Sequence, residues 1–162
     1  MGTAAAFMKL REQVGAQGNV IGVDVAPGMI RAARRRVPDA ALVRADARAL
    51  PFIDRTFDIV WSSYLLDLIP TRELPLLLLE FGRVLRPSGR VLLVNLSKKG
   101  EQKTWWERIY QRTPSRLVPY LFGSCRPIQA APLVRDAGFI QTERELASEG
   151  LDSEVVMAAK PL

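Results

Sequence analysis

Short apolar segments with the character of strands alternate along this chain with segments whose apolar residues recur at helical spacing. Three apolar runs, 19–24, 41–46 and 56–62, end in acidic or small polar residues, and a fourth, 90–96, is apolar almost throughout. Strands this apolar are typically buried on both faces, and helices between successive strands indicate parallel connections. The alternation therefore predicts a doubly wound α/β fold with a mostly parallel sheet.

Four segments beside these strands have the apolar spacing of amphipathic helices. Their expected bounds are 4–14, 27–37, 71–85 and 128–137. Thr71 is the predicted N-cap of the third helix. The buried stripe that the spacing predicts for the second helix consists of Met29, Ala32, Ala33 and Val37.

The last two expected strands, 140–146 and 153–160, are separated only by a short turn around Gly150. A parallel crossover needs a dozen or more residues, so these strands must form a C-terminal antiparallel pair. A chain of 162 residues, 48% of them hydrophobic, buries one ordinary core but hardly two, which predicts a single domain over 1–162. Residues 98–127 break the alternation and form an aromatic-rich insertion or lid.

The composition excludes several classes of site. The chain has no histidine and one cysteine, Cys125, which excludes a zinc site, a Ser-His-Asp triad and an internal disulfide. No metal site is expected. No apolar run reaches the roughly 18 residues of a membrane span, and the first residues lack the order of a secretion signal, so the sequence predicts a cytoplasmic protein.

The chain is basic, with 23 lysines and arginines against 17 acids and a net charge of +6. The cluster of basic residues is confined to the expected second helix, at Arg31, Arg34, Arg35 and Arg36. The other basic residues are interleaved with acids, and no aromatic-basic alternation accompanies them. We interpret the cluster as a solvated helix face and expect no nucleic-acid partner.

Polar residues end three of the expected strands. Ligands of open parallel sheets bind beyond the carboxyl ends of the strands, and these ends carry Asp24, Asp46 and the run Ser62-Ser63-Tyr64. A carboxylate after such a strand accepts two hydrogen bonds from the cis-diol of a ribose, which makes Asp24 the strongest binding candidate. Two structural alternatives stay open: Asp24 caps the following helix, and Asp46 is a surface acid.

Four segments of the chain, in order and at suitable spacing, match the motifs of a known family. They are Val20-Ile21-Gly22-Val23-Asp24 with Pro27-Gly28-Met29, Arg44-Ala45-Asp46-Ala47 with Leu50-Pro51-Phe52, Phe57-Asp58-Ile59-Val60, and Arg83-Val84-Leu85-Arg86-Pro87-Ser88-Gly89-Arg90. In these segments the chain resembles the class I S-adenosylmethionine-dependent methyltransferases, in particular those of ubiquinone and menaquinone biosynthesis. The resemblance extends over nearly the whole chain and implies their Rossmann-like fold.

The resemblance implies S-adenosylmethionine as the cofactor and gives its site. Asp24 would bind the ribose hydroxyls, Met29 would pack near the adenine, and Asp46 with the backbone of Ala47 would read the adenine edge. Ser62 and its neighbours would line the methionine moiety. The full set of implied cofactor residues is Gly2, Thr3, Asp24, Val25, Met29, Asp46, Ala47, Ser62 and Ser63.

The acceptor implied by this reading is a small, apolar or lipid-like molecule. Tyr64 and Asp67 are candidate catalytic residues that assist deprotonation, although both equally suit the start of a helix. The insertion supplies candidate substrate residues, namely Trp105, Trp106, Phe122 and Arg126. It is a lid over the acceptor, an element in peripheral contact with a membrane, or ordinary core packing.

The chain departs from the family at its start. Family members begin with a strand that leads into an acidic, glycine-rich loop, whereas here Gly2 already precedes Asp24 by 22 positions. We therefore expect an N-terminally truncated domain, with a gap in the sheet or a strand supplied by a partner chain, as in a homodimer. A catalytically inactive remnant that serves as an interaction or dimerisation module stays open, and a nicotinamide-dependent oxidoreductase is a distant third reading.

Overall fold

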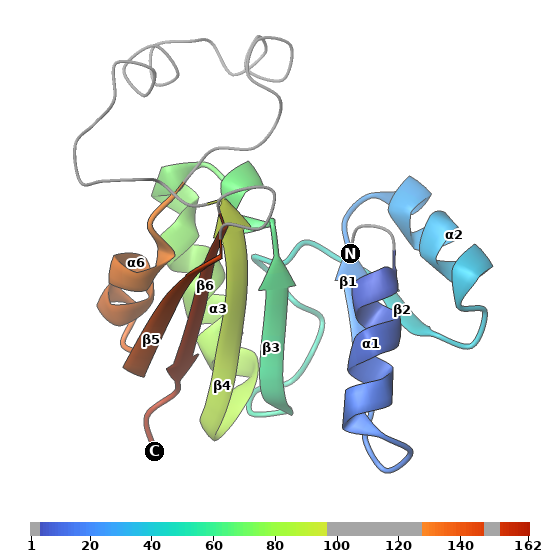
Figure 1. Ribbon diagram of the computed structural model, residues 1–162, viewed down its shortest axis with the longest axis horizontal. Helices are drawn as coiled ribbons and strands as arrows, with labels where there is room; N and C mark the ends of the chain where they lie inside the picture. The colour runs from blue at the N-terminus through green and yellow to red at the C-terminus, as the bar shows by residue number, and fades with distance from the viewer. Residues whose placement is uncertain (1–3, 97–127, 148–152) are drawn as a thin grey trace, which may run out of the picture. The chain divides into compact units, whose positions relative to one another are not determined.

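The computed structural model describes residues 4–96, 128–147 and 153–162 (Figure 1). The chain divides into two compact units, Met1–Ile53 and Asp54–Leu162. Each unit has its own sheet, and each is described by itself below. No helix in the described ranges is long and apolar enough to cross a bilayer.

The first unit contains two helices and two strands. They are α1 (Ala5–Val14), β1 (Ile21–Asp24), α2 (Pro27–Arg36) and β2 (Ala41–Arg44). The strands pair in parallel as the sequence predicts, with Ile21 opposite Ala41 and Asp24 opposite Arg44. Pro27 begins α2, where its missing N–H and fixed φ cost nothing. This unit thus orders a strand, a tight connection and a helix around Asp24.

A small apolar core fixes α2 in the first unit. Phe7 of α1 and Ala33 of α2 are buried in one cluster with Ala4 and Val37. The prediction that Ala32 belongs to the buried stripe is wrong, because Ala32 is exposed and only the Ala33 side of the helix faces the core. All of the clustered arginines are exposed, as expected for a solvated face, at positions 31, 34, 35 and 36.

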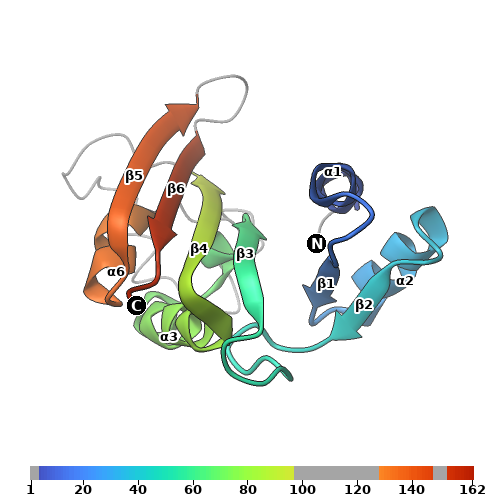
Figure 2. The same ribbon diagram turned by 90° about the horizontal axis from the view of Figure 1, so that it is seen from below.

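The second unit is built on a four-stranded sheet with the order β3-β4-β6-β5. Its elements are β3 (Phe57–Ser63), the 3-10 turns η1 (Leu66–Leu68) and η2 (Thr71–Glu73), α3 (Leu74–Val84), β4 (Leu85–Leu96), α6 (Ala130–Asp136), β5 (Ile140–Ala147) and β6 (Ser153–Ala159). The β3–β4 pair is parallel, and β5–β6 is antiparallel as predicted. β6 also pairs antiparallel with β4, so the last strand lies between two earlier ones (Figure 2).

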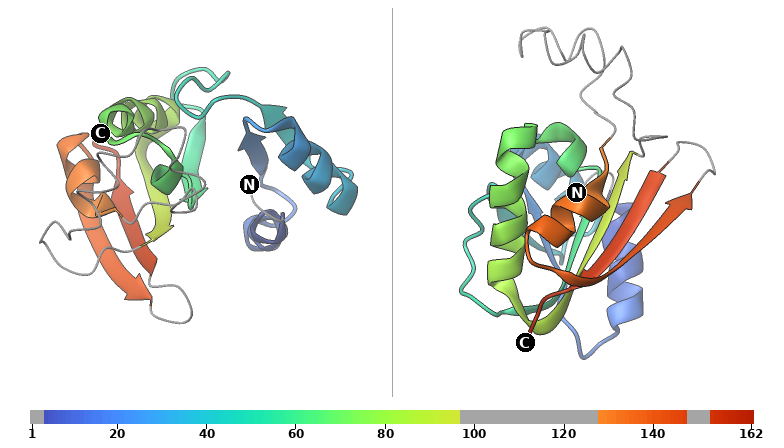
Figure 3. Two further views of the ribbon diagram at one scale, coloured as in Figure 1. Left: turned by 90° about the horizontal axis from the view of Figure 1, so that it is seen from above. Right: turned by 90° about the vertical axis from the view of Figure 1, so that its left-hand side faces the viewer.

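Helices α3 and α6 cover the same face of this sheet (Figure 3). Along β4 the side chains alternate between the two faces: Val91 and Leu93 are fully buried, whereas Leu92 and Val94 are only partly buried. The same alternation continues on β6, where Val156 is fully buried opposite Leu93. The core of the second unit therefore lies between α3, α6 and this face.

Two expected boundaries of α3 are wrong. The helix begins at Leu74 rather than after Thr71, which starts the preceding 3-10 turn. Pro75 explains the difference, because proline lacks a backbone N–H and is tolerated only in the first helical turn. Leu85 is the first residue of β4 rather than the end of the helix, because it pairs with Phe57 of β3.

The expectation that β1 and β3 are buried on both faces is wrong for part of each strand. Ile21 is 36% exposed and Ile59 is 59% exposed. In the described ranges β1 pairs only with β2 and β3 only with β4, so the two sheets have no strand pair in common. The expected truncation at the start of the domain stays a prediction.

Candidate functional site

Asp24 and Asp46 follow the two strands of the first unit at the same end. Asp24 closes β1 opposite Arg44, and its carbonyl oxygen accepts the backbone N–H of Ala45 at 3.2 Å. Asp46 comes directly after Ala45. Parallel pairing therefore brings both carboxylates to the carboxyl end of β1 and β2, where an α/β sheet binds its ligand.

The Asp24 side chain shapes the connection into α2. Its Oδ1 accepts the backbone N–H of Ala26, the N-cap residue of the helix, at 2.9 Å. The side chain is half-buried, so a ligand also reaches it. A carboxylate oxygen accepts more than one hydrogen bond, so the turn does not exhaust the acceptor capacity of Asp24. Asp24 therefore fixes the turn before α2, but no side-chain hydrogen bond caps the helix itself, so the alternative that Asp24 serves as the helix cap is wrong.

Asp46 is held by Arg48. The Asp46 Oδ1 accepts the Arg48 backbone N–H at 2.9 Å, and its Oδ2 lies 2.5 Å from the Arg48 guanidinium. The side-chain hydrogen bond from Arg48, followed by the backbone one, lowers the pKa of Asp46 to about 2. Asp46 therefore stays ionised at any physiological pH, in a fixed orientation.

The residues between and beside these acids are apolar. Val25, directly after Asp24, is 61% exposed. Met29 in α2 and Ala47 after Asp46 are half-buried. Two carboxylates beside an exposed aliphatic side chain match an adenosine, whose sugar donates hydrogen bonds and whose base is a flat, weakly polar ring. The carboxylate acceptors and aliphatic side chains of this unit are compatible with the predicted cofactor, and the roles of the individual residues stay predictions.

In the second unit, Ser62, Ser63 and Tyr64 lie at the carboxyl end of β3. Ser62 is buried and Ser63 is exposed. Tyr64 adopts a left-handed backbone with φ of 52°, and its N–H donates to the Val94 carbonyl at 2.7 Å. Its hydroxyl lies 3.0 Å from Oγ of Ser153. The Tyr64 ring is thus directed by both its backbone and its hydroxyl.

Asp67 lies in η1 and is only 2% exposed. Its Oδ2 accepts the backbone N–H of Leu96, the last residue of β4, at 3.1 Å. This bond is a structural contribution, because it fixes the end of β4 against η1. The structure therefore places Asp67 beside the carboxyl end of β4 but inside the protein.

Sequence reasoning missed Asn95. This residue of β4 is fully buried, and both its Oδ1 and its Nδ2 lack a hydrogen-bond partner. The signal was visible, since Asn95 is the one amide within the apolar run 90–96. A polar residue in a strand that is otherwise apolar marks a position with a function or a buried partner.

Several predicted residues lie outside the described ranges. They are Gly2, Thr3, Trp105, Trp106, Phe122 and Arg126, together with Cys125 and the insertion 98–127. Their proposed roles stay predictions. In the part of the chain that the structure does describe, no three acidic or cysteine side chains gather as metal ligands would.

The family follows from comparison with known proteins. Residues 1–89, more than half of the chain, match a family model described as a methyltransferase domain. This chain belongs to the class I S-adenosylmethionine-dependent methyltransferases. The resemblance seen in its motifs and the cofactor that it implies are confirmed at the level of the family.

Individual relatives share this family. The chain is 31% identical over 165 residues to a demethylmenaquinone methyltransferase of Symbiobacterium thermophilum, covering 85% of this chain and 65% of the relative. It is 36% identical over 103 residues to the ubiquinone/menaquinone biosynthesis C-methyltransferase UbiE of Yersinia pestis, covering 60% and 40%. The chain thus spans less than two thirds of the length of these curated relatives.

A solved structure confirms the fold class. The crystal structure of an S-adenosylmethionine-dependent methyltransferase from Methanosarcina mazei matches with a TM-score of 0.71 at 19% identity, over 99% of this chain and 89% of that one. At this identity the match supports the fold alone. The predicted α/β, Rossmann-like methyltransferase fold is therefore confirmed.

Proposed function

We propose that this chain transfers the methyl group of S-adenosylmethionine to a small, apolar, quinol-like acceptor. The observation that carries the proposal is the placement of Asp24 and Asp46 at the carboxyl end of the parallel β1–β2 pair. The names of the relatives supply the acceptor class, since the Symbiobacterium thermophilum protein is named for demethylmenaquinone. Both units would serve one methyltransferase domain.

The first unit would hold the adenosine. Asp24 would accept hydrogen bonds from the two ribose hydroxyls while its Oδ1 keeps the turn to Ala26. Val25 and Met29 would pack against the adenine, and Asp46, oriented by Arg48, would accept from the adenine edge. Gly2 and Thr3 would approach the methionine end through their backbone, as in a glycine loop. S-adenosylmethionine supplies an electrophilic methyl group on a sulfonium.

The second unit would hold the acceptor. Such a transfer needs alignment and exclusion of water more than a strong base. Ser62 and Ser63 would line the methionine moiety, and Tyr64, oriented by Ser153, would help to remove a proton from the acceptor. Asp67, which is buried, would fix the end of β4 through its hydrogen bond to the backbone of Leu96. Trp105, Trp106, Phe122 and Arg126 would cover the acceptor.

A lipid-like acceptor brings further expectations. We propose peripheral contact with a membrane surface through the insertion 98–127, and a cytoplasmic location. We also propose a homodimer. In the described ranges β3 pairs only with β4, so its other edge is unpaired there, and its Ile59 is exposed. Open strand edges of this kind readily pair with another strand.

Two measurements test the proposed function. Calorimetric titration should detect S-adenosylmethionine binding to the intact chain. Transfer of a labelled methyl group should then occur to a short-chain demethylmenaquinol but not to the oxidised quinone, because only the quinol has an electron-rich ring. Absence of cofactor binding would contradict the proposal and favour the inactive interaction module.

A further inference from the structure

Two buried side chains near the carboxyl ends of β3 and β4 have polar atoms without a partner. Asn95 is fully buried, and neither end of its carboxamide is hydrogen-bonded. Ser62 is 6% exposed, and its Oγ is likewise without a partner. Buried polar groups in folded proteins are nearly always hydrogen-bonded. Two exceptions at the same end of neighbouring strands therefore call for one explanation.

Strand pairing puts these two side chains on the same face of the sheet. Ser62 is paired with Leu93, and Asn95 lies two residues beyond Leu93 on β4. Paired residues share a face, as do alternate residues along a strand. Leu93 is fully buried on the face that α3 and α6 cover, so Ser62 and Asn95 belong to that face too. Their free polar atoms are inside the second unit.

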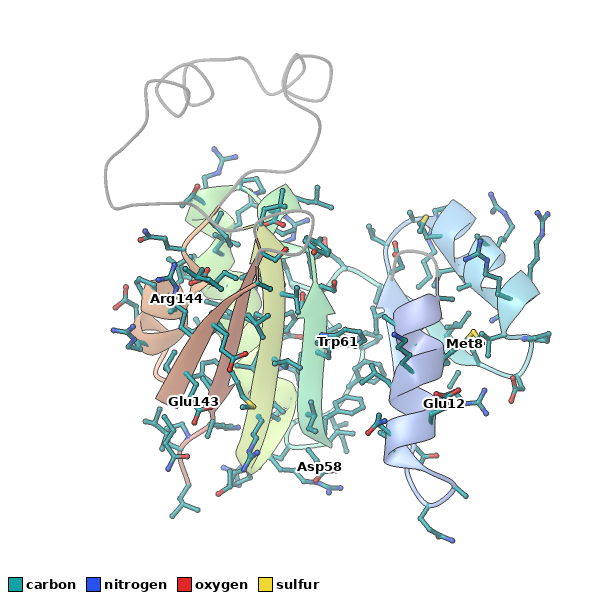
Figure 4. The ribbon with its side chains drawn as sticks, viewed as in Figure 1. Met8, Glu12, Asp58, Trp61, Glu143 and Arg144 are labelled. Atoms are coloured by element: carbon teal, nitrogen blue, oxygen red, sulfur yellow. The ribbon has the colours of Figure 1, made fainter. Side chains whose placement is uncertain are left out.

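The buried carboxylate paired with Asn95 in the β4–β6 register makes no hydrogen bond to it. Glu154 lies opposite Asn95 in the β4–β6 pair and is fully buried. Its Oε2 accepts the backbone N–H of Ala130 at 2.7 Å, and its Oε1 accepts from Nε of Arg144 at 2.5 Å. Figure 4 labels Arg144, which belongs to β5. Glu154 therefore ties α6 and β5 to β6 and makes no bond to the carboxamide.

The chain holds this end of β4 in place. Asp67 Oδ2 accepts the backbone N–H of Leu96, the residue directly after Asn95. Leu66, in the same 3-10 turn, is fully buried and adds apolar surface. The carboxamide therefore lies at a fixed strand end, on the face of the sheet that also carries Leu93. A preorganised polar group in apolar surroundings is the usual form of a ligand-orienting residue.

We propose that Asn95, together with Oγ of Ser62 at the boundary between the methionine moiety and the acceptor, binds a neutral phenolic hydroxyl carried by an apolar ring of the acceptor. This inference rests on the proposed function and adds the residues that recognise the acceptor. A carboxamide both donates and accepts, as does a serine hydroxyl, so the pair complements a group that also does both. An anionic group fits less well, because the buried Asp67 carboxylate lies at the same strand end. Leu66 and Leu93 supply the apolar surface for the ring.

The probes that test this inference are 1-naphthol and naphthalene, which differ only by the hydroxyl. Each is titrated into the intact chain, and its dissociation constant is measured by calorimetry. The wild-type protein should bind 1-naphthol about tenfold more tightly than naphthalene. Asn95→Leu, which keeps the branching and the number of side-chain heavy atoms and removes both polar ends, should lose that tenfold preference and keep its affinity for naphthalene. Ser62→Ala should lose part of the preference.

A stability measurement separates binding from a structural role. Asn95→Leu should unfold at the same or a higher urea concentration, because it removes buried polar atoms that have no partner. Thr142→Val is the matched control, since Oγ1 of Thr142 on β5 is also buried without a partner. This control should gain stability in the same way and keep the full preference for 1-naphthol.

Three results would overturn the inference. They are equal affinity of the wild type for both probes, an unchanged preference in Asn95→Leu, and destabilisation of Asn95→Leu but not of Thr142→Val. The pair would then hold only a buried water or serve the fold. Cofactor affinity and methyl transfer are measured in the same variants. A chain that discriminates the probes but transfers no methyl group would contradict the proposed function and leave this inference standing.

Discussion

The hydroxyl of Tyr64 and Oγ of Ser153 lie 3.0 Å apart, joining the residue after β3 to the first residue of β6. Tyr64 reaches this position with a left-handed backbone, φ 52°, that non-glycine residues rarely adopt. Such strain is retained where the surroundings hold it, and it is concentrated at functional sites. The bond and the strain together support a role for the Tyr64 hydroxyl at the acceptor.

We expect Tyr64→Phe and Ser153→Ala to lose the same hydrogen bond and about 0.5–1.5 kcal/mol of unfolding free energy each. Turnover should distinguish them, because only Tyr64→Phe removes the hydroxyl that we propose assists proton removal. Its rate should fall roughly tenfold or more, with a smaller fall for Ser153→Ala. Urea denaturation and a methyl-transfer assay measure the two effects. Equal rates in both variants would speak against a catalytic role.

Asp24→Asn should weaken cofactor binding without disturbing the fold. The asparagine oxygen still accepts the Ala26 N–H that Asp24 Oδ1 binds at 2.9 Å, but the negative charge is lost. Hydrogen bonds to a charged group contribute about 1.5–3 kcal/mol, which corresponds to a rise of the dissociation constant by roughly tenfold to a hundredfold. Calorimetric titration with S-adenosylmethionine measures this dissociation constant. Asp39→Asn, an exposed acid of the same unit paired with Arg11, is the control and should bind normally.

Arg48→Ala should raise the pKa of Asp46 from about 2 part of the way toward its ordinary value of 3.8, since it removes the side-chain hydrogen bond that lowers this pKa most and keeps the backbone one. A lowered folded-state pKa stabilises the protein above pH 4, and this contribution is lost as the pH falls toward 2. Both side chains are 38% exposed, so solvent screening keeps it below about 1 kcal/mol. Carbon-detected NMR titration of the Asp46 carboxyl is the measurement. Arg11→Ala should leave that titration unchanged.

Gly89→Ala should destabilise the protein by about 1–3 kcal/mol through overpacking. A Cβ at Gly89 would lie 2.8 Å from the Arg86 carbonyl oxygen and 3.2 Å from that of Asp58, and backbone atoms do not yield easily. Gly82→Ala in α3 is the matched control in the same unit. Its Cβ would lie 3.7 Å from the nearest atom, Cζ of Phe139, which is ordinary van der Waals contact. It should gain roughly 0.5–1 kcal/mol, as alanine favours the helix. Thermal denaturation measures the stability of both variants, and equal melting temperatures would contradict the packing argument.

Much of the first unit could be predicted because local sequence determines it. Pro27 begins α2 as expected, and short apolar runs that end in an acid predicted β1 and β2 within two residues of their observed bounds. The start of α3 was missed because the position of Pro75 in the first turn outweighs the capping preference of Thr71. The start of α3 could have been predicted from the sequence, because Pro75 lacks the backbone N–H that a later helical position needs.

The polar contacts of the site were harder to predict, because they join residues far apart in sequence. Asp67 and Leu96 are 29 positions apart, and Tyr64 and Ser153 are 89 apart. The sequence identified Tyr64 and Asp67 by their place after a strand, but it gave no sign of their partners. Asn95 is a different case, because a single amide in an apolar strand is visible in the sequence. Only the strand register shows that it shares a face with Ser62.

The position of β6 between β4 and β5 has a consequence for synthesis of the chain. Ribosomes release a protein from its N-terminus, and β4 and β5 both emerge before Ser153. Neither strand has its shared neighbour until β6 has left the ribosome, so the hydrogen-bonding edges of both are exposed to other nascent chains in the meantime. The four-stranded sheet is therefore completed late, and chaperone binding during translation should concentrate on β4 and β5.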